Sequence, residues 1–201
     1  MLDSAVQAAL RPVLSRAGAK LHRAGVSADA VTLTGFAVGL ASAVAIALGH
    51  FLTGLSLLLL SRLLDGLDGA VARAAQPTDR GGFLDITLDF VFYAAIPLAF
   101  AIADPTRNAL AAAVLLASFI GTGSSFLAFA ALAQKRGLSD TRLPDKSFYF
   151  LGGLTEATET LTAFAAMCLW PASFPVIAFV FAALCVITTA LRIVWGWQRL
   201  G

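Results

Sequence analysis

The chain has 201 residues, of which 59% are hydrophobic before its 17 glycines are counted, and only 13% are charged, with a formal net charge of +2. Such a chain cannot cover its surface with polar groups, which excludes a soluble globular domain, and its hydrophobicity excludes intrinsic disorder. Because its two cysteines, Cys168 and Cys185, lie inside apolar runs, a disulfide scaffold is excluded as well, and the composition predicts an all-α integral membrane protein.

The first 25 residues are basic and amphipathic. Among their alanines and leucines stand Arg11, Arg16, Lys20 and Arg23. We expect residues 1–25 to form a juxtamembrane helix that lies on the membrane surface, with an ordinary cytosolic helix end as the alternative. No cleavable signal peptide is expected.

Six apolar segments follow, each near the ~20 residues that cross a bilayer core of ~30 Å. We expect spans near 29–49, 52–75, 82–103, 108–134, 147–170 and 174–197. The predicted architecture is an N-terminal amphipathic surface helix plus six transmembrane helices, in which residues 26–201 form one domain.

The cations predict the orientation of these spans. Eleven of the 14 Lys and Arg residues fall on the side of the N-terminus, and only Arg107 falls on the opposite side. Because cytoplasmic loops carry the excess of Lys and Arg, we expect both termini and the connections at 76–81 and 135–146 to face the cytoplasm. A cell inner or plasma membrane is the expected location.

Four aspartates stand where an apolar span should exclude them. Asp65 and Asp68 lie near the end of the second span, and Asp85 and Asp89 near the start of the third. Spacings of three and four place each pair on one face of its helix, and a short turn makes the two helices antiparallel neighbours. We therefore expect the four carboxylates to face each other at one depth.

A multivalent cation is the physical remedy for such a cluster. Carboxylate oxygens select hard ions, so Mg²⁺ (or Mn²⁺) is expected, and four carboxylates are enough to bridge two ions. Two such ions can stabilise the attacking and leaving oxygens of a phosphoryl displacement. Arg73 lies about one turn beyond Asp68 and suits a phosphate, and the helix start at Gly81 and Gly82 offers backbone N–H groups to an anion.

These residues resemble the signature of the CDP-alcohol phosphatidyltransferase family. That signature reads D-x-x-D-G-x-x-A-R, a gap of seven or eight residues, then G-x-x-x-D-x-x-x-D. Every fixed position is present, at Asp65, Asp68, Gly69, Ala72, Arg73, Gly81, Asp85 and Asp89. The six-span layout with a preceding surface helix resembles the family too.

The resemblance implies an enzyme of phospholipid biosynthesis. Such enzymes move the phosphatidyl group of CDP-diacylglycerol onto an alcohol and release CMP. It implies metal binding by Asp65, Asp68, Asp85 and Asp89, with Asp89 also the general base that takes the proton of the acceptor hydroxyl. It places Gly69, Ala72 and Arg73 around the CDP moiety. A homodimer is expected, because relatives commonly form one, and no nucleic-acid partner is.

One stretch departs from the family pattern. Many members carry Pro-Asn-x-x-Thr where the first span begins, and this chain has Ala28-Asp29-Ala30-Val31-Thr32. Aspartate is a good N-cap, so we interpret Asp29 as a residue that starts the helix. Thr32 remains the candidate for a contact with the nucleotide.

The acceptor alcohol is predicted less sharply. Arg80 and the basic residues Lys135, Arg136, Arg142 and Lys146 could hold a phosphorylated acceptor such as glycerol 3-phosphate. The same charges are explained by the positive-inside rule and by anionic headgroups. Glu156 and Glu159, expected about three turns into the fifth span, either pair with Arg62 or Arg192 in the bundle core, which we favour, or shape the acceptor pocket.

Two other classes of membrane protein use intramembrane acids. An aspartate-rich, Mg²⁺-dependent prenyltransferase also binds a diphosphate, but its acidic motifs normally sit on loops of a larger bundle with repeated halves. A cation transporter predicts acids along a transmembrane path and internal repeats. The single bipartite motif, at one depth and without a repeat, favours the phosphatidyltransferase.

Overall fold

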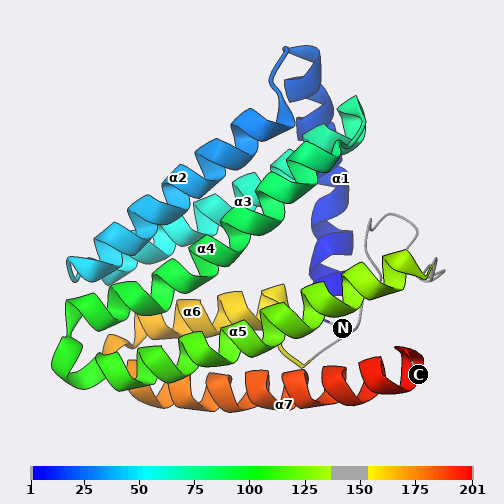
Figure 1. Ribbon diagram of the computed structural model, residues 1–201. Helices are drawn as coiled ribbons and strands as arrows, with labels where there is room; N and C mark the ends of the chain where they lie inside the picture. The colour runs from blue at the N-terminus through cyan, green and yellow to red at the C-terminus, as the bar shows by residue number, and fades with distance from the viewer. Residues whose placement is uncertain (1, 137–153, 201) are drawn as a thin grey trace.

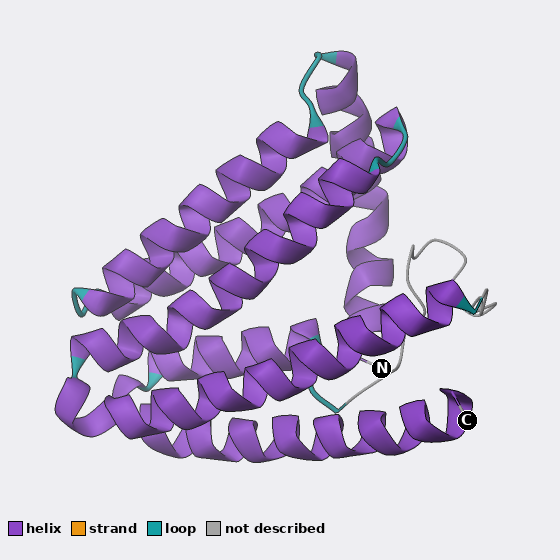
Figure 2. Cartoon of the chain, in the orientation of Figure 1, coloured by secondary structure: helices purple, strands orange, loops and turns teal. Residues whose placement is uncertain are grey.

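The computed structural model describes residues 2–136 and 154–200, in which every regular element is helical and no β-strand occurs (Figures 1 and 2). Two helices precede the acid-bearing pair: α1 spans Leu2–Arg23 and α2 spans Ala28–Ala47. The acids lie on α3 (Phe51–Ala75) and α4 (Asp79–Ala103). The chain continues with α5 (Pro105–Lys135), α6 (Ala157–Leu169), the short 3-10 helix η1 (Pro171–Ser173) and α7 (Phe174–Leu200).

Four of the described helices are long and apolar enough to cross a membrane. These are α2, α4, α5 and the continuous stretch from η1 through α7. Helix α3 has 25 residues, but its second half carries Arg62, Asp65 and Asp68, which lower its hydropathy. Helix α6 is apolar but has only 13 residues. Large apolar side chains on the outer surface, such as Leu110 at 71% and Ile120 at 72% exposure, fit a lipid environment. The chain is an integral membrane protein.

The helices form two layers that meet at one end. Helices α2, α3 and α4 pack together in one layer, and α5, α6 and α7 form the other. Figure 1 shows the layers joined at the α4–α5 turn and diverging toward the opposite end, where α3 ends and α4 begins. Helix α1 packs on α3 and α6, and so bridges the two layers on the diverging side.

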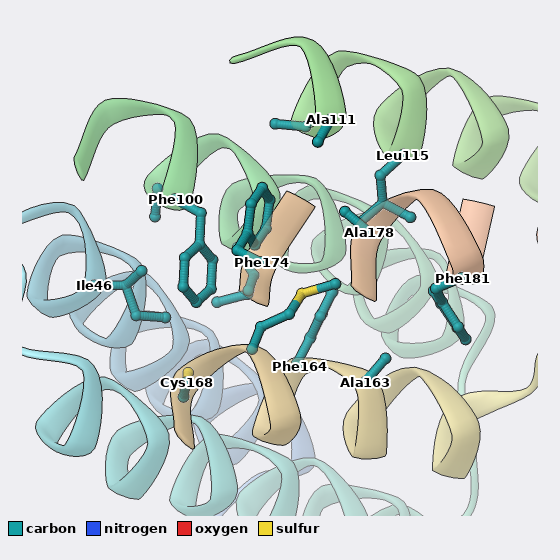
Figure 3. Packing of buried hydrophobic residues seen from close by; sticks show 14 of the residues in the cluster. Ile46, Phe100, Ala111, Leu115, Ala163, Phe164, Cys168, Phe174, Ala178 and Phe181 are labelled. Carbon is teal, nitrogen blue, oxygen red and sulfur yellow. The ribbon is translucent and has the colours of Figure 1, made fainter. Parts of the chain in front are cut away.

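The hydrophobic core lies at the joined end. Phe100 near the end of α4 stacks on Phe174 at the start of α7, with ring centroids 4.5 Å apart, and on Phe51 at the start of α3 at 5.7 Å. Figure 3 shows Phe100 and Phe174 among buried residues of α5 and α6, including Leu115 and Phe164, both fully buried. Aromatic stacking of this kind fixes the end of the bundle away from the acids.

Small residues bring α2 close to α3 and α4. Ser42 donates to the carbonyl of Gly54 at 2.7 Å, and Ser61 donates to the carbonyl of Gly35 at 2.8 Å. Gly39 faces the ring of Phe92 and the hydroxyl of Ser61, with no space for a side chain. Such close approach of backbones is the usual way in which membrane helices associate.

Two tight connections use glycine where a side chain is disfavoured. Gly25 after α1 and Gly49 after α2 both have φ of +81°. The next residue in each case donates back into the helix, Val26 to Leu21 at 3.0 Å and His50 to Ala45 at 2.8 Å. This is the Schellman type of helix end, and it lets the chain reverse within a few residues.

Helix α1 makes close backbone contact with the acid-bearing helix. A Cβ atom added at Gly18 would lie 2.7 Å from the backbone carbon of Ala70 on α3. Gly66, one turn earlier on α3, faces Leu14 of α1. The contact therefore lies beside Asp68, which belongs to the same turn of α3 as Ala70.

The packing around Gly39 predicts a large effect of a single methyl group. A Cβ added there would lie 2.6 Å from the ring of Phe92, which is fully buried. We expect Gly39→Ala to destabilise the fold by about 1–3 kcal/mol, because overpacking displaces neighbours that cannot move freely. Thermal unfolding in detergent checks this, with Gly82→Ala as control, since nothing lies within 4 Å of the Cβ added there. Equal unfolding temperatures of the two variants would contradict the expectation.

Candidate active site

The structure brings three of the four aspartates together. Asp65 and Asp68 lie in the last three turns of α3, and Asp85 lies in the second turn of α4. One carboxylate oxygen from each of these three residues lies within 4.8 Å of the other two. Helices α3 and α4 run antiparallel on either side of residues 76–78 and both pack on α2, and this arrangement produces the convergence.

This oxygen cluster fits a hard divalent cation. Oxygen ligands of Mg²⁺, at about 2.1 Å from the ion, lie roughly 3 to 4.2 Å from one another, and those of larger ions slightly further apart. Asp68 is only 4% exposed, and its Oδ2 is buried without a hydrogen-bond partner. A buried carboxylate oxygen with no donor needs a positive charge to satisfy it. The residues present therefore fit the metal that the sequence predicts.

The fourth aspartate has a different partner. Asp89 Oδ1 accepts a hydrogen bond from Nη1 of Arg62 at 2.6 Å, and the same nitrogen lies 3.3 Å from Asp65 Oδ1. Arg62 stands one turn before Asp65 on α3. Its role was not evident from the sequence, where it is one of three arginines inside predicted spans. The signal that could have revealed it is its spacing of three from the first acid.

An open cleft lies beside the acids. It is lined by Thr32, Gly35, Phe36, Arg62, Asp65, Asp85, Leu88 and Asp89. Three helices contribute, so the cleft depends on the packing of α2 against α3 and α4. Thr32 lies on this wall, as its candidate role requires, and its hydroxyl donates to the carbonyl of Ala28 at 3.1 Å.

The remaining motif residues of α3 lie just beyond the acids. The guanidinium of Arg73 folds back over Gly69, where an added Cβ would lie 3.3 Å from Nη1. Ala72 is half-buried next to it. The absence of a side chain at Gly69 is what allows the arginine to lie along the helix toward the acids. A phosphate placed there would meet a positive charge close to the carboxylate cluster.

The interpretation of Asp29 as a helix cap was wrong. Ser27 is the N-cap of α2, and its hydroxyl accepts from the backbone N–H of Ala30 at 3.2 Å. Asp29 instead accepts a hydrogen bond from Arg80 at 2.5 Å, which joins the starts of α2 and α4. Serine and aspartate cap equally well, so the sequence alone does not decide between neighbouring candidates. Arg80, a candidate for the acceptor, therefore already has a carboxylate partner.

The predicted anion site at the start of α4 was also wrong. Thr78 caps this helix, and its hydroxyl accepts from the N–H of Gly81 at 3.1 Å. Its carbonyl accepts from the N–H of Gly82 at 3.0 Å. Because both N–H groups already have acceptors, neither is left for a phosphate. The glycine at 81 instead provides room beside Asp29, whose Oδ1 would lie 3.4 Å from an added Cβ.

Of the other acceptor candidates, Lys135 is described by the structure. Lys135 is the last residue of α5 and is exposed. Figure 1 shows α5 diverging from α4 toward this end. Arg142 and Lys146 lie outside the described residues. The structure therefore places Lys135 on the diverging side of the molecule without bringing it to the aspartates.

Glu156 and Glu159 stand at a helix start, not three turns into a span. Helix α6 begins at Ala157, and Glu156 is its N-cap, with its backbone N–H donating to the side chain of Glu159 at 3.2 Å. Of the two arginines predicted as partners of the glutamates, Arg62 pairs with aspartates instead. Arg192 is 8% exposed, donates to the carbonyl of Thr122 at 3.0 Å, and lies within electrostatic range of Glu156. Glu156 and Glu159 form a capping box at the start of α6, which accounts for their spacing of three.

Comparison with known proteins identifies the family. The family model described as CDP-alcohol phosphatidyltransferase matches residues 26–194. The chain belongs to this family, and it is accordingly a membrane-bound transferase of phospholipid biosynthesis rather than a prenyltransferase or a transporter. The family assignment made from the bipartite aspartate motif is confirmed.

Individual relatives agree with this assignment. The chain is 50% identical over 200 residues to the "Inner membrane protein YnjF" of Escherichia coli, which covers 100% of this chain and 97% of that protein. Over 81 residues it is 48% identical to an archaetidylinositol phosphate synthase of Methanothermobacter thermautotrophicus, covering 39% of this chain and 42% of that protein.

Solved structures share the fold. The phosphatidylinositol phosphate synthase PgsA1 of Mycobacterium tuberculosis, solved with CDP-DAG bound, matches with a TM-score of 0.72 and 25% identity, covering 92% of this chain and 94% of that one. The same protein in complex with manganese and citrate matches with a TM-score of 0.71 and 24% identity, covering 92% and 88%.

Because Oδ2 of Asp68 is buried without a hydrogen-bond partner, we predict that Asp68 contributes strongly to metal affinity. We expect Asp68→Asn to weaken Mn²⁺ binding by about tenfold or more, because a neutral amide replaces one anionic ligand in a buried site. Mn²⁺ titration followed by electron paramagnetic resonance measures this. Asp104→Asn is the control, since Asp104 caps α5 at the other end of the bundle. Unchanged affinity in Asp68→Asn would show that the cluster does not hold the ion.

Proposed function

We propose that the chain transfers the phosphatidyl group of CDP-diacylglycerol to the hydroxyl of a phosphorylated polyol and releases CMP. The observation that carries this proposal is the meeting of three carboxylates within 4.8 Å beside a cleft that contains a fourth. The relative PgsA1 binds CDP-DAG on a similar fold, which supports the donor. The names of PgsA1 and of the archaeal relative, both inositol phosphate-type synthases, support a phosphorylated polyol as the acceptor.

The residues of the cleft have roles in this reaction. The acceptor oxygen attacks the phosphorus that carries the diacylglycerol, the bond from this phosphorus to the bridging diphosphate oxygen breaks, and CMP leaves with the electron pair. Asp89 takes the proton of the hydroxyl. Arg73 binds the diphosphate, Gly69 and Ala72 leave room for the CDP moiety, and Thr32 contacts it from α2. Mg²⁺ or Mn²⁺ bound by Asp65, Asp68 and Asp85 would neutralise charge on the leaving diphosphate oxygens.

The proposal includes a membrane orientation. In it, α2 to α7 provide six spans, α1 lies at the membrane surface, and both termini and the cleft face the cytoplasm. The distribution of Lys and Arg supports this, because Arg107 alone falls on the other side. The diverging ends of the two layers would then open toward the cytoplasmic leaflet, where a lipid-tailed donor enters from the side and a polar acceptor from water. A homodimer is part of the proposal.

Asp89 gives the sharpest test of the chemistry. We expect Asp89→Asn to lower kcat for CMP release from CDP-diacylglycerol by about 10²-fold or more, because an amide cannot take the proton of the acceptor. The KM for CDP-diacylglycerol should change little. The control is Asp79→Asn, which removes a carboxylate from the first turn of the same helix. Full activity of Asp89→Asn would refute the assignment of the base while leaving the metal site standing.

The acceptor is identified by a panel of alcohols. Purified chain with CDP-diacylglycerol and Mg²⁺ is offered glycerol 3-phosphate, inositol phosphate, serine or phosphatidylglycerol, and CMP is measured. We expect turnover with a phosphorylated polyol, and about a tenfold higher acceptor KM in Lys135→Ala and in Arg142→Ala, because each loses a cation for the phosphate. Lys20→Ala, which removes an exposed cation of α1, is the control. Turnover with serine alone, or an unchanged KM, would contradict the phosphate-binding role.

A further inference from the structure

We propose that Arg62 is a built-in cation of the active site, which takes the place of a second divalent ion and holds Asp89 in position. The chain would then bind one divalent ion, through Asp65, Asp68 and Asp85, and not two. This inference rests on the proposed metal site and assigns a role to a residue outside the family signature.

The first argument is the pairing of Arg62 with both helices. Its Nη1 lies 2.6 Å from Asp89 on α4 and 3.3 Å from Asp65 on α3. Its side chain is only 10% exposed, so the guanidinium is removed from water at the base of the cleft. A bridging cation between these two carboxylates is where a second metal ion would otherwise bind.

The second argument is that Arg62 is held in place by its surroundings. The guanidinium carbon lies 4.0 Å above the ring centre of Phe92 and 5.7 Å from that of Tyr93. Its Nη2 donates to the hydroxyl of Ser61 at 3.3 Å, and Ser61 is itself fixed to Gly35 of α2. A cation over aromatic rings in a desolvated site is stabilised there, so displacement by a metal ion is opposed.

The third argument is the charge balance. Four carboxylates with Arg62 leave a net charge of −3, which one divalent ion reduces to −1. A second divalent ion between Asp65 and Asp89 would stand next to the guanidinium and make the site positive before the substrate arrives. Repulsion between cations a few ångströms apart in a low-dielectric site opposes this state.

The role of Arg62 in the reaction is that of a positioning residue. Because Arg62 bonds to Oδ1 of Asp89, it fixes the rotation of the carboxylate, and Oδ2 is the oxygen that takes the proton. The charge of the arginine is permanent at any relevant pH, unlike that of an exchangeable ion. Arg62 would therefore hold Asp65 and Asp89 in position before metal or substrate binds.

The test counts metal ions in the absence of nucleotide and acceptor. Purified chain in detergent is titrated with Mn²⁺, and bound ions are counted by electron paramagnetic resonance and calorimetry. We expect one Mn²⁺ per unmodified chain and two in Arg62→Gln, with spin coupling between the two ions in the variant. Arg62→Lys keeps the charge and should bind one. Arg192→Gln, the same change at another buried arginine, should also bind one.

The outcomes separate this inference from the proposed function. Two coupled Mn²⁺ ions in the unmodified chain, or none, would overturn it even if Arg62→Gln failed to fold. A count of one in both the unmodified chain and a folded Arg62→Gln would also overturn it. Failure to release CMP with every acceptor would instead count against the proposed function and leave the metal count unaffected.

Discussion

The structure depends on one constraint, which is that carboxylates partly buried in an apolar helix bundle must be compensated. A buried charge without a partner costs several kcal/mol, so the chain keeps its aspartates only by bringing them together with compensating groups. The antiparallel arrangement of α3 and α4 against α2 achieves this for Asp65, Asp68 and Asp85, and Arg62 neutralises part of the charge. The clustered carboxylates make the site costly to bury, and the same carboxylates make it able to bind a cation.

The rest of the bundle is tightly packed at the end away from the aspartates and open at the end that carries them. Stacked rings of Phe51, Phe100 and Phe174 close the end opposite the acids. The acid-bearing end is fixed by hydrogen bonds and small residues, such as Ser61 bonded to Gly35. These contacts hold three helices together while the two layers diverge, so the aspartates lie away from the hydrophobic core at the joined end.

The sequence was sufficient for the all-helical class, for most of the helices and for the meeting of three of the four acids. Helix positions follow from the length of apolar segments, and the convergence of Asp65 with Asp85 follows from periodicity and a short turn. Pairings between helices were not accessible in the same way. Whether Arg62 reaches Asp89 or Glu156 depends on how each helix is rotated about its axis, which spacing along one chain does not determine.

The local errors have a similar cause. Ser27 rather than Asp29 caps α2, and Thr78 satisfies the N–H of Gly81, because several residues of equal capping ability compete within one turn. Glu156 was assigned to the middle of a span because hydropathy continues across a helix boundary that a capping box defines. The choice between such neighbours is made by tertiary contacts.

The contact between Gly18 and Ala70 connects the N-terminal helix directly to the turn of α3 beside the aspartate cluster. Backbone meets backbone there, without intervening side chains that could absorb a displacement. A tag fused to the N-terminus, or bilayer curvature that tilts α1, would thus push directly on the turn of α3 that carries Asp68. A bilayer that tilts α1 would in this way displace the aspartate cluster without any change in its residues.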